Sequence, residues 1–196
     1  MPDKRRYRMG ARAQKAAETR QRVFDAAIAL FGAHAYEQVS LQDIASRAGV
    51  GLQTVVRIGA SKDELFVTAA RQIQLDVALR LAAVPNRGLV STLEFLVDLY
   101  EEWGDPLIRM MAQEDRIPAV HELFQGGRRA QVLWIDARYG AQLDHLDAEE
   151  RERRVVSLLV VTGARSWYVF RRVHGLSKTQ IVLAMREMVE ALVRVR

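Results

Sequence analysis

The chain has 196 residues, a net charge of +5 and 49% hydrophobic residues, a composition typical of a globular protein with one large or two small domains. It contains no cysteine, which excludes disulfides, thiolate metal ligands and a cysteine nucleophile and favours a reducing, cytoplasmic location. Its longest uncharged apolar run, residues 155–164, is far shorter than the roughly 20 residues of a membrane-spanning helix. The basic N-terminus has no apolar segment of the kind found in secretory signals. We therefore expect a soluble protein that does not enter a membrane.

Positive charge is concentrated at the N-terminus. Residues 1–22 carry eight basic side chains against two acidic ones, so their net charge of +6 exceeds that of the whole chain. A basic arm on a nearly neutral body is the electrostatic footprint of a protein that binds a polyanion such as nucleic acid. The alternative is a solvated tail that only aids solubility. We assign residues 1–18 to this arm.

Apolar residues recur at helical spacing along nearly the whole chain, and no segment shows the alternation of a strand. The pattern predicts an all-α fold of about nine helices. The first four are expected at about residues 14–32, 41–48, 51–58 and 62–83. Ser40 with Asp43, and Ser61 with Glu64, have the spacing of N-terminal helix caps.

Glycine and proline predict the helix boundaries in the middle of the chain. Gly104 and Pro106 predict the end of a helix over about 88–103 and the start of the next one. A further helical segment is expected to start at Pro118. The pair at residues 126 and 127 predicts an interruption of that segment, because a glycine inside a helix costs about 1 kcal/mol relative to alanine.

The last two predicted helices are unusually apolar. The first covers about residues 148–173 and is expected to end at Gly175, and residues 155–164 within it are apolar around nearly the whole helix. Ser177 and Gln180 predict the cap of the final helix. Two such helices from each of two subunits can form a four-helix bundle, and a deep intrachain core is the alternative.

Residues 40–58, with the sequence SLQDIASRAGVGLQTVVRI, predict two short helices joined by a turn at Gly49. A glycine there can adopt the left-handed conformation that a sharp turn requires. Such a pair is a helix-turn-helix, whose second helix enters the DNA major groove. Two packed helices with polar outer faces are the alternative. The inward positions of the pair are Ile44, Ala48, Val50, Val55 and Ile58.

The outer face of the second helix carries Leu52, Gln53, Val56 and Arg57. A glutamine can pair with adenine, an arginine with guanine or phosphate, and an apolar side chain such as Val56 can touch a thymine methyl group. Three residues near the helix starts are expected to contact the DNA backbone. They are Ser40, Gln42 and Thr54.

From about Thr19 to Leu65 the sequence resembles the N-terminal DNA-binding domain of the TetR (tetracycline-repressor-type) transcriptional regulators. The resemblance lies in AAIALF, Tyr36, VSLQDIASRAGV, Thr54 and SKDEL. It implies a helix-turn-helix over residues 19–61 and a C-terminal domain over 62–196 that forms a homodimer and holds a small-molecule effector. It also implies a palindromic double-stranded DNA operator and a phosphate contact from Lys62.

The chain departs from the family pattern at three positions of the second helix and the turn after it. The family usually has a tyrosine that reaches a DNA phosphate at the position of Val56. An aromatic residue is usual at Ile58, and a phenylalanine that packs the recognition helix is usual at Gly59. The chain therefore lacks the usual side chains for one phosphate contact and for part of the packing of the recognition helix.

Aromatic and methionine residues in the C-terminal part are candidates for the lining of an effector pocket. Large apolar groups with a few polar side chains are typical of such pockets, although each residue alone fits an ordinary core equally well. The candidates for the lining are Trp103, Met110, Trp134 and Trp167. Arg138, Arg165 or His121 is a candidate for orienting a polar group of the ligand, with a surface ion pair as the alternative.

Catalytic and metal-binding patterns are missing from the sequence. The four histidines do not have metal-ligand spacing, and no phosphate-binding loop, G-x-S-x-G or H-E-x-x-H motif occurs. We therefore expect no cofactor, no metal and no enzyme. The sequence predicts a dimeric transcriptional regulator, most simply a repressor released by a small apolar effector. A helical ligand-binding module that has lost DNA binding, or a small helical enzyme, is the alternative.

Overall fold

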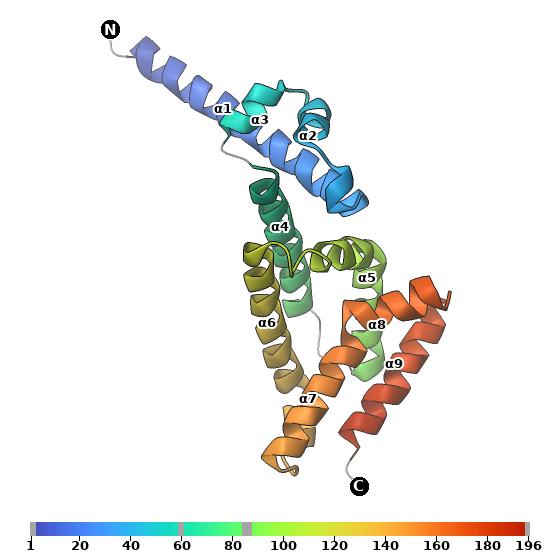
Figure 1. Cartoon of the computed structure of the whole chain (residues 1–196). Coiled ribbons are helices and arrows are strands. Elements are labelled where there is room, and N and C mark those ends of the chain that lie inside the picture. The colour runs from blue at the N-terminus through green and yellow to red at the C-terminus, as the bar shows by residue number, and fades with distance from the viewer. Residues whose placement is uncertain (1–2, 59–60, 84–87, 195–196) are drawn as a thin grey trace. The chain divides into compact units, whose positions relative to one another are not determined.

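The structure, a computed structural model, describes residues 3–58, 61–83 and 88–194, with side chains from residue 13 onward. In these residues it contains nine α-helices, one 3₁₀ turn, one π-helical turn and no strand (Figure 1). The predicted all-α class and helix number are confirmed. No helix in the described ranges is long and apolar enough to cross a membrane. The chain forms two compact units, residues 1–72 and residues 73–196.

The first unit contains three complete helices, one 3₁₀ turn and the start of a fourth helix. They are α1 (Asp3–Ala33), η1 (Tyr36–Gln38), α2 (Leu41–Ala48), α3 (Leu52–Arg57) and the first half of α4 (Lys62–Ala82). The helix start predicted near residue 14 is wrong, because α1 already begins at Asp3. Alanine, glutamine, lysine and arginine are strong helix formers and dominate residues 11–17, which extends the helix beyond the apolar stripe used to predict it.

Aromatic packing holds the helices of the first unit together. Phe31 of α1, Tyr36 of η1 and Phe66 of α4 form a cluster of three buried rings. The ring of Phe66 meets the other two edge-on, at centroid distances of 4.9 Å from Phe31 and 5.1 Å from Tyr36. Edge-to-face pairs contribute about 0.5–1.5 kcal/mol beyond the area that they bury. Three elements that are separate in sequence are therefore fixed to one another at this cluster.

The second unit contains the rest of α4 and the five remaining α-helices. The latter are α5 (Leu89–Met111), α6 (Pro118–Leu143), α7 (Ala148–Thr162), α8 (Ala164–Tyr168) and α9 (Lys178–Val193), with the π-helical turn η2 (Val169–Val173) between α8 and α9. The caps predicted at Ser61 and Ser177 are confirmed, because Glu64 N–H donates to Ser61 Oγ (3.1 Å) and Gln180 N–H donates to Ser177 Oγ (3.3 Å).

Two helix boundaries predicted from glycine and proline are wrong. α5 continues through Gly104 and Pro106, and α6 continues through the glycine pair at residues 126 and 127. In both helices a glycine faces a close neighbour: Gly104 lies against the indole of Trp167, and Gly127 lies against the amide of Gln74. The close neighbours leave no room for a larger side chain at these two positions. The helices therefore contain glycine there despite its low helix propensity.

The structure has a helix boundary near residue 163 that the sequence did not predict. The helix expected over 148–173 is interrupted at Gly163, which ends α7 and begins α8. The segment is also not buried on all sides: Val155, Leu158 and Val161 are buried, but Val160 is 62% exposed. α7 therefore buries one face in its own unit and leaves an apolar stripe on the other.

Candidate functional site

The turn between α2 and α3 has the geometry of a helix-turn-helix. Gly49 adopts the left-handed conformation (φ 65°, ψ 40°) that the sequence predicted for this position. The N–H groups of Gly49 and Val50 donate to the carbonyl oxygens of Ser46 (3.2 Å) and Ala45 (3.0 Å) and close the end of α2. Any residue with a Cβ would be strained at this φ. Gly49 therefore sets the angle at which α3 leaves α2.

The start of α2 is fixed by a reciprocal cap between Ser40 and Asp43. Asp43 N–H donates to Ser40 Oγ (3.1 Å), and Ser40 N–H donates to Asp43 Oδ2 (2.8 Å). The hydrogen bond from the Ser40 side chain, followed by that from its backbone, lowers the pKa of Asp43. The hydroxyl predicted to contact DNA is thus already engaged in the cap. Gln42 lies beside it on the exposed side of α2.

α3 has one buried and one exposed face. Val55 is fully buried, whereas Leu52 is 37% and Val56 is 50% exposed, and Gln53 and Arg57 are exposed as well. The predicted outward face is therefore confirmed as a surface. The other residues predicted to point inward or to contact the DNA backbone from this region, Val50, Thr54 and Ile58, are half-buried. Gly59, the third departure from the family pattern, lies outside the described residues.

Lys62, at the start of α4, is held by a neighbour that the sequence did not indicate. Its ammonium group lies 4.1 Å from the centroid of the Tyr36 ring. The hydroxyl of Tyr36 donates to a carboxylate oxygen of Asp63. The tyrosine therefore positions both residues of the first turn of α4, and Lys62 is half-buried at the surface of the first unit.

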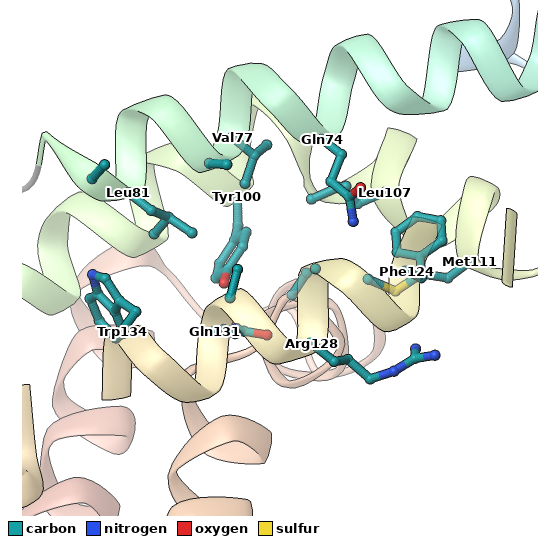
Figure 2. A pocket seen from close by; sticks show the side chains of 15 residues that line it. Gln74, Val77, Leu81, Tyr100, Leu107, Met111, Phe124, Arg128, Gln131 and Trp134 are labelled. Atoms are coloured by element: carbon teal, nitrogen blue, oxygen red, sulfur yellow. The ribbon is translucent and has the colours of Figure 1, made fainter. Parts of the chain in front are cut away.

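The second unit contains a cavity of about 320 Å³ between α4, α5 and α6. Figure 2 shows Gln74 and Val77 reaching from α4 toward Gln131 and Trp134 of α6, with the ring of Tyr100 between the two helices. Most of the 15 lining residues are apolar. The largest of these are Leu81, Leu107, Met111, Phe124 and Trp134. A volume and lining of this kind are typical of a site for a small organic molecule.

The polar groups of the cavity are few and largely engaged. The Gln74 amide N–H donates to the carbonyl of Leu123 (3.1 Å), and the Tyr100 hydroxyl donates to the carbonyl of Thr162 (2.9 Å). Burial raises the pKa of Tyr100 far above its ordinary value, so its hydroxyl stays neutral. Gln131 makes no hydrogen bond with another described residue, and its amide is the polar group available to a ligand.

Only one of the five residues in the predicted ligand set lines this cavity, namely Trp134. Met110 and Trp167 are fully buried core residues, and Trp103 is half-buried. The guanidinium of Arg138 lies 4.7 Å from the centroid of the Trp134 ring and donates to Thr92 Oγ1 (3.1 Å). Arg165 and His121 are exposed and do not line the cavity. The sequence missed Gln74, Tyr100 and Gln131, because the spacing of residues along single helices does not show where three helices leave a gap.

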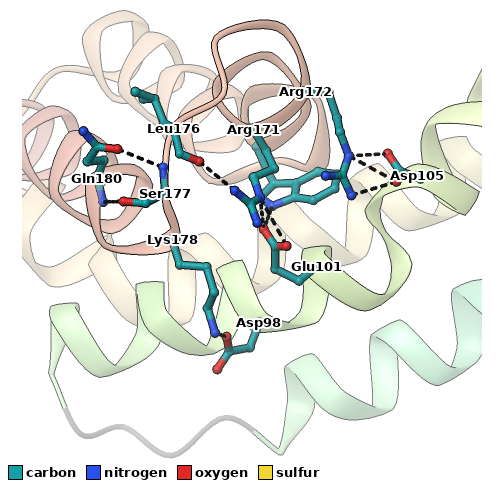
Figure 3. Close-up of polar contacts among 10 residues, drawn as sticks. Asp98, Glu101, Asp105, Arg171, Arg172, Leu176, Ser177, Lys178 and Gln180 are labelled. Atoms are coloured by element: carbon teal, nitrogen blue, oxygen red, sulfur yellow. Dashed lines mark hydrogen bonds and ion pairs between the residues drawn. The ribbon is translucent and has the colours of Figure 1, made fainter.

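Ion pairs fix the side of α5 that meets η2 and α9 (Figure 3). Arg172 donates to both carboxylate oxygens of Asp105 (2.9–3.2 Å), Arg171 pairs with Glu101 (2.9 Å), and Lys178 pairs with Asp98. The indole N–H of Trp167 also donates to Glu101 (3.1 Å). Three acidic residues spaced three and four apart thus form one face of α5 and anchor the helix that supplies Tyr100 to the cavity.

Within the described ranges no group of three or more His, Asp or Glu side chains is placed to hold a metal ion. The residues around Asp144 and His145 form a solvated turn between α6 and α7.

The comparisons with known proteins agree with this geometry. Residues 23–69 match the family model of bacterial regulatory proteins of the tetR family. No curated protein matches the chain. A TetR-family transcriptional regulator from Streptomyces coelicolor has a similar solved structure, with a TM-score of 0.71, 22% identity and coverage of 91% of this chain and 87% of that one.

Two further solved structures are similar over most of the chain. One is a transcriptional regulator from Rhodococcus sp. Rha1, with a TM-score of 0.69, 19% identity and coverage of 88% of this chain and 95% of that one. The other is the multidrug binding protein EbrR complexed with imidazole, with a TM-score of 0.65, 20% identity and coverage of 90% and 96%. At these identities the likeness shows the fold.

The family match covers α2, the Gly49 turn, α3 and the first turns of α4. The regulators of this family are DNA-binding proteins and not enzymes. The match and the helix-turn-helix geometry together identify residues 23–69 as a DNA-binding domain of the TetR type.

Proposed function

We propose that the protein is a homodimeric repressor that leaves a palindromic operator when a small, mainly apolar molecule enters the cavity of its second unit. The observation that carries this proposal is that one helix, α4, contributes both a predicted DNA contact and part of the cavity lining. The helix supplies Lys62 at its start and Gln74, Val77 and Leu81 to the cavity. A ligand that binds more tightly to one arrangement of α4 than to another shifts the population toward that arrangement.

In the proposed complex the exposed face of α3 lies in the major groove. Gln53 and Arg57 contact base edges, while Leu52 and Val56 provide apolar contacts, including contacts with thymine methyl groups. Ser40, Gln42, Thr54 and Lys62 contact the sugar-phosphate backbone. The exposure of the four α3 residues supports these roles.

The functional division of the chain follows from the same proposal. Residues 1–18 form a basic segment that adds phosphate contacts, residues 19–61 bind the operator, and residues 62–196 bind the effector and the second subunit. Continuation of α1 to Asp3 makes this segment part of a helix. The absence of cysteine and the DNA target both support a cytoplasmic location.

The homodimer is proposed to form through the last helices of the chain. The exposed apolar side chains on α7 and α9 support this, since Val156, Val160 and Leu183 are each about half exposed or more. Two-fold pairing also matches a palindromic operator, whose half-sites lie about one helical turn apart. A role in small-molecule binding is supported by the similar protein EbrR, which has been solved with imidazole and with proflavin.

The proposal is tested by selecting binding sites from a random pool of double-stranded DNA. Enrichment of a palindrome, together with a dimer mass in analytical ultracentrifugation, is the expected result. A folded dimer that enriches no sequence at low salt would support the alternative of a ligand-binding module without an operator. In that case Val56→Tyr would be the first substitution to test for a gain of DNA binding.

A further inference from the structure

The cavity between α4, α5 and α6 restricts the charge of the molecule that it can hold. We infer that the ligand is uncharged, with a naphthalene-sized apolar body and one hydrogen-bonding group, such as a carbonyl, that is read by the amide of Gln131. This inference rests on the proposed effector role of the cavity and names the chemical class of the effector.

The first step concerns cations. None of the 15 residues that line the cavity carries a carboxylate. Burying an ammonium or a delocalised organic cation without a counter-charge is costly, because its hydration is lost and nothing replaces it. The tyrosine cannot serve as the counter-charge, since the pKa of Tyr100 is raised by burial and its hydroxyl donates to a backbone carbonyl.

The second step concerns anions. Arg128 is the only charged residue in the lining, and Figure 2 shows its side chain extending away from Gln131 and Tyr100. Its guanidinium already donates to both carboxylate oxygens of Glu114, at 2.9 and 3.1 Å. An anionic ligand would have to displace Glu114, whose side chain is only 12% exposed, and would leave that carboxylate unpaired. Both signs of charge are therefore disfavoured.

The third step concerns the hydrogen bond. The two amides of the lining differ in their availability, because Gln74 is held by Leu123 and packs against Gly127, whereas Gln131 makes no hydrogen bond with a described residue. An amide left without a partner beside an apolar ligand loses its hydration without compensation. A ligand with one acceptor or donor at this position restores the bond, so Gln131 selects for such a group.

The test measures binding to the DNA-free protein by isothermal titration calorimetry with four probes of similar shape. These are 2-acetylnaphthalene, 2-ethylnaphthalene, trimethyl(2-naphthyl)ammonium and 2-naphthoate. We expect the ketone to bind about five-fold more tightly than the hydrocarbon, as one net hydrogen bond predicts. The cation and the carboxylate should each bind at least about ten-fold more weakly than the ketone.

Substitutions at Gln131 connect the preference to this side chain. Gln131→Leu should reduce ketone affinity to that of the hydrocarbon and leave the hydrocarbon unchanged. The matched control is Gln125→Leu on the same helix, whose amide lies near His121 and outside the cavity lining, and it should change neither value. Gln131→Glu places a carboxylate in the cavity and should make the ammonium probe the tightest of the four, provided that circular dichroism shows a folded protein.

Three results would overturn the inference. They are tighter binding of either charged probe to the wild-type protein, no binding of any probe, and an unchanged preference in both Gln131 variants. The outcome is separable from that of the proposed function, because release of selected operator DNA by the ketone is measured in a second experiment. Binding without release would refute the effector role and leave the ligand class standing, whereas release by a charged molecule would do the reverse.

Discussion

The indole of Trp167 fills the space in which a side chain at Gly104 would lie. A Cβ built at residue 104 of α5 would lie 2.2 Å from Cζ3 and 2.5 Å from Cε3 of the Trp167 ring of α8. The indole is fully buried and its N–H is fixed by Glu101, so the ring has little freedom to move away. The glycine is therefore required by the packing of α8 on α5, and the helix continues through it.

This contact predicts the effect of one methyl group. Gly104→Ala should lower the free energy of unfolding by about 1–3 kcal/mol, because overpacking outweighs the gain in helix propensity. Gly126→Ala is the matched control, since it lies within α6 and has no atom within 4 Å of its Cβ position. It should stabilise the protein by about 0.5–1 kcal/mol. Urea unfolding followed by circular dichroism measures both, and a neutral Gly104→Ala would contradict the packing argument.

Arg57 is expected to read a base. Its substitution by alanine should cost about 1–3 kcal/mol in operator affinity and relax the preference at one position of each half-site. Binding-site selection repeated with the variant measures both effects. Arg129→Ala, an exposed arginine on α6, is the control and should leave the selected sequence unchanged. Full sequence preference in the Arg57 variant would limit this residue to a phosphate contact or to none.

The basic N-terminal segment is expected to contribute phosphate contacts. Deleting residues 1–18 should reduce the slope of log K against log salt concentration by about 0.9 for each phosphate contact that is lost, because fewer counterions are released. Residues 13–18 are exposed, so the urea midpoint should change little. The slope is measured by fluorescence anisotropy on operator DNA. An unchanged slope would show that the segment does not touch the DNA.

Tyr100 is expected to make stability depend on alkaline pH. Burial raises its pKa in the folded state, whereas the unfolded chain ionises near the ordinary value of about 10. The unfolded state then binds fewer protons than the folded state, so stability falls as the pH rises above about 10. Urea unfolding of the wild type and of Tyr100→Phe at pH 8 and above should therefore show a steeper loss in the wild type. Parallel losses would mean that Tyr100 does not stay protonated when folded.

The caps and the helix-turn-helix could be predicted because their signals are local. Ser40, Gly49 and Ser61 act on residues within four positions of themselves, and the structure places them as expected. Gly104 and Gly127 misled the prediction because their partners, Trp167 and Gln74, are distant in sequence. Helix propensity alone predicts that the helix ends at such glycines, but tertiary contacts override it and the helix continues.

The cavity could not be predicted for a related reason. Its key residues, Gln74 on α4 and Gln131 on α6, belong to helices whose approach depends on the packing of the whole unit. Trp134 lines the cavity, whereas Met110 and Trp167 fill the core, because large apolar side chains fit either role. The lack of a tyrosine at Val56 is readable from the sequence, and its effect on DNA affinity stays a prediction.

The ion pairs between α5 and the π-helical turn have a consequence for the order of folding. The contacts of Glu101 and Asp105 with Trp167, Arg171 and Arg172 join residues 66 to 70 positions apart in the chain. Closing such a long loop costs chain entropy before the contact can stabilise the protein. We therefore expect these contacts to form after the local helices. Weakening these pairs should accordingly quicken unfolding and leave the rate of folding nearly unchanged. The acidic face of α5 should therefore slow the unfolding of the C-terminal third of the chain.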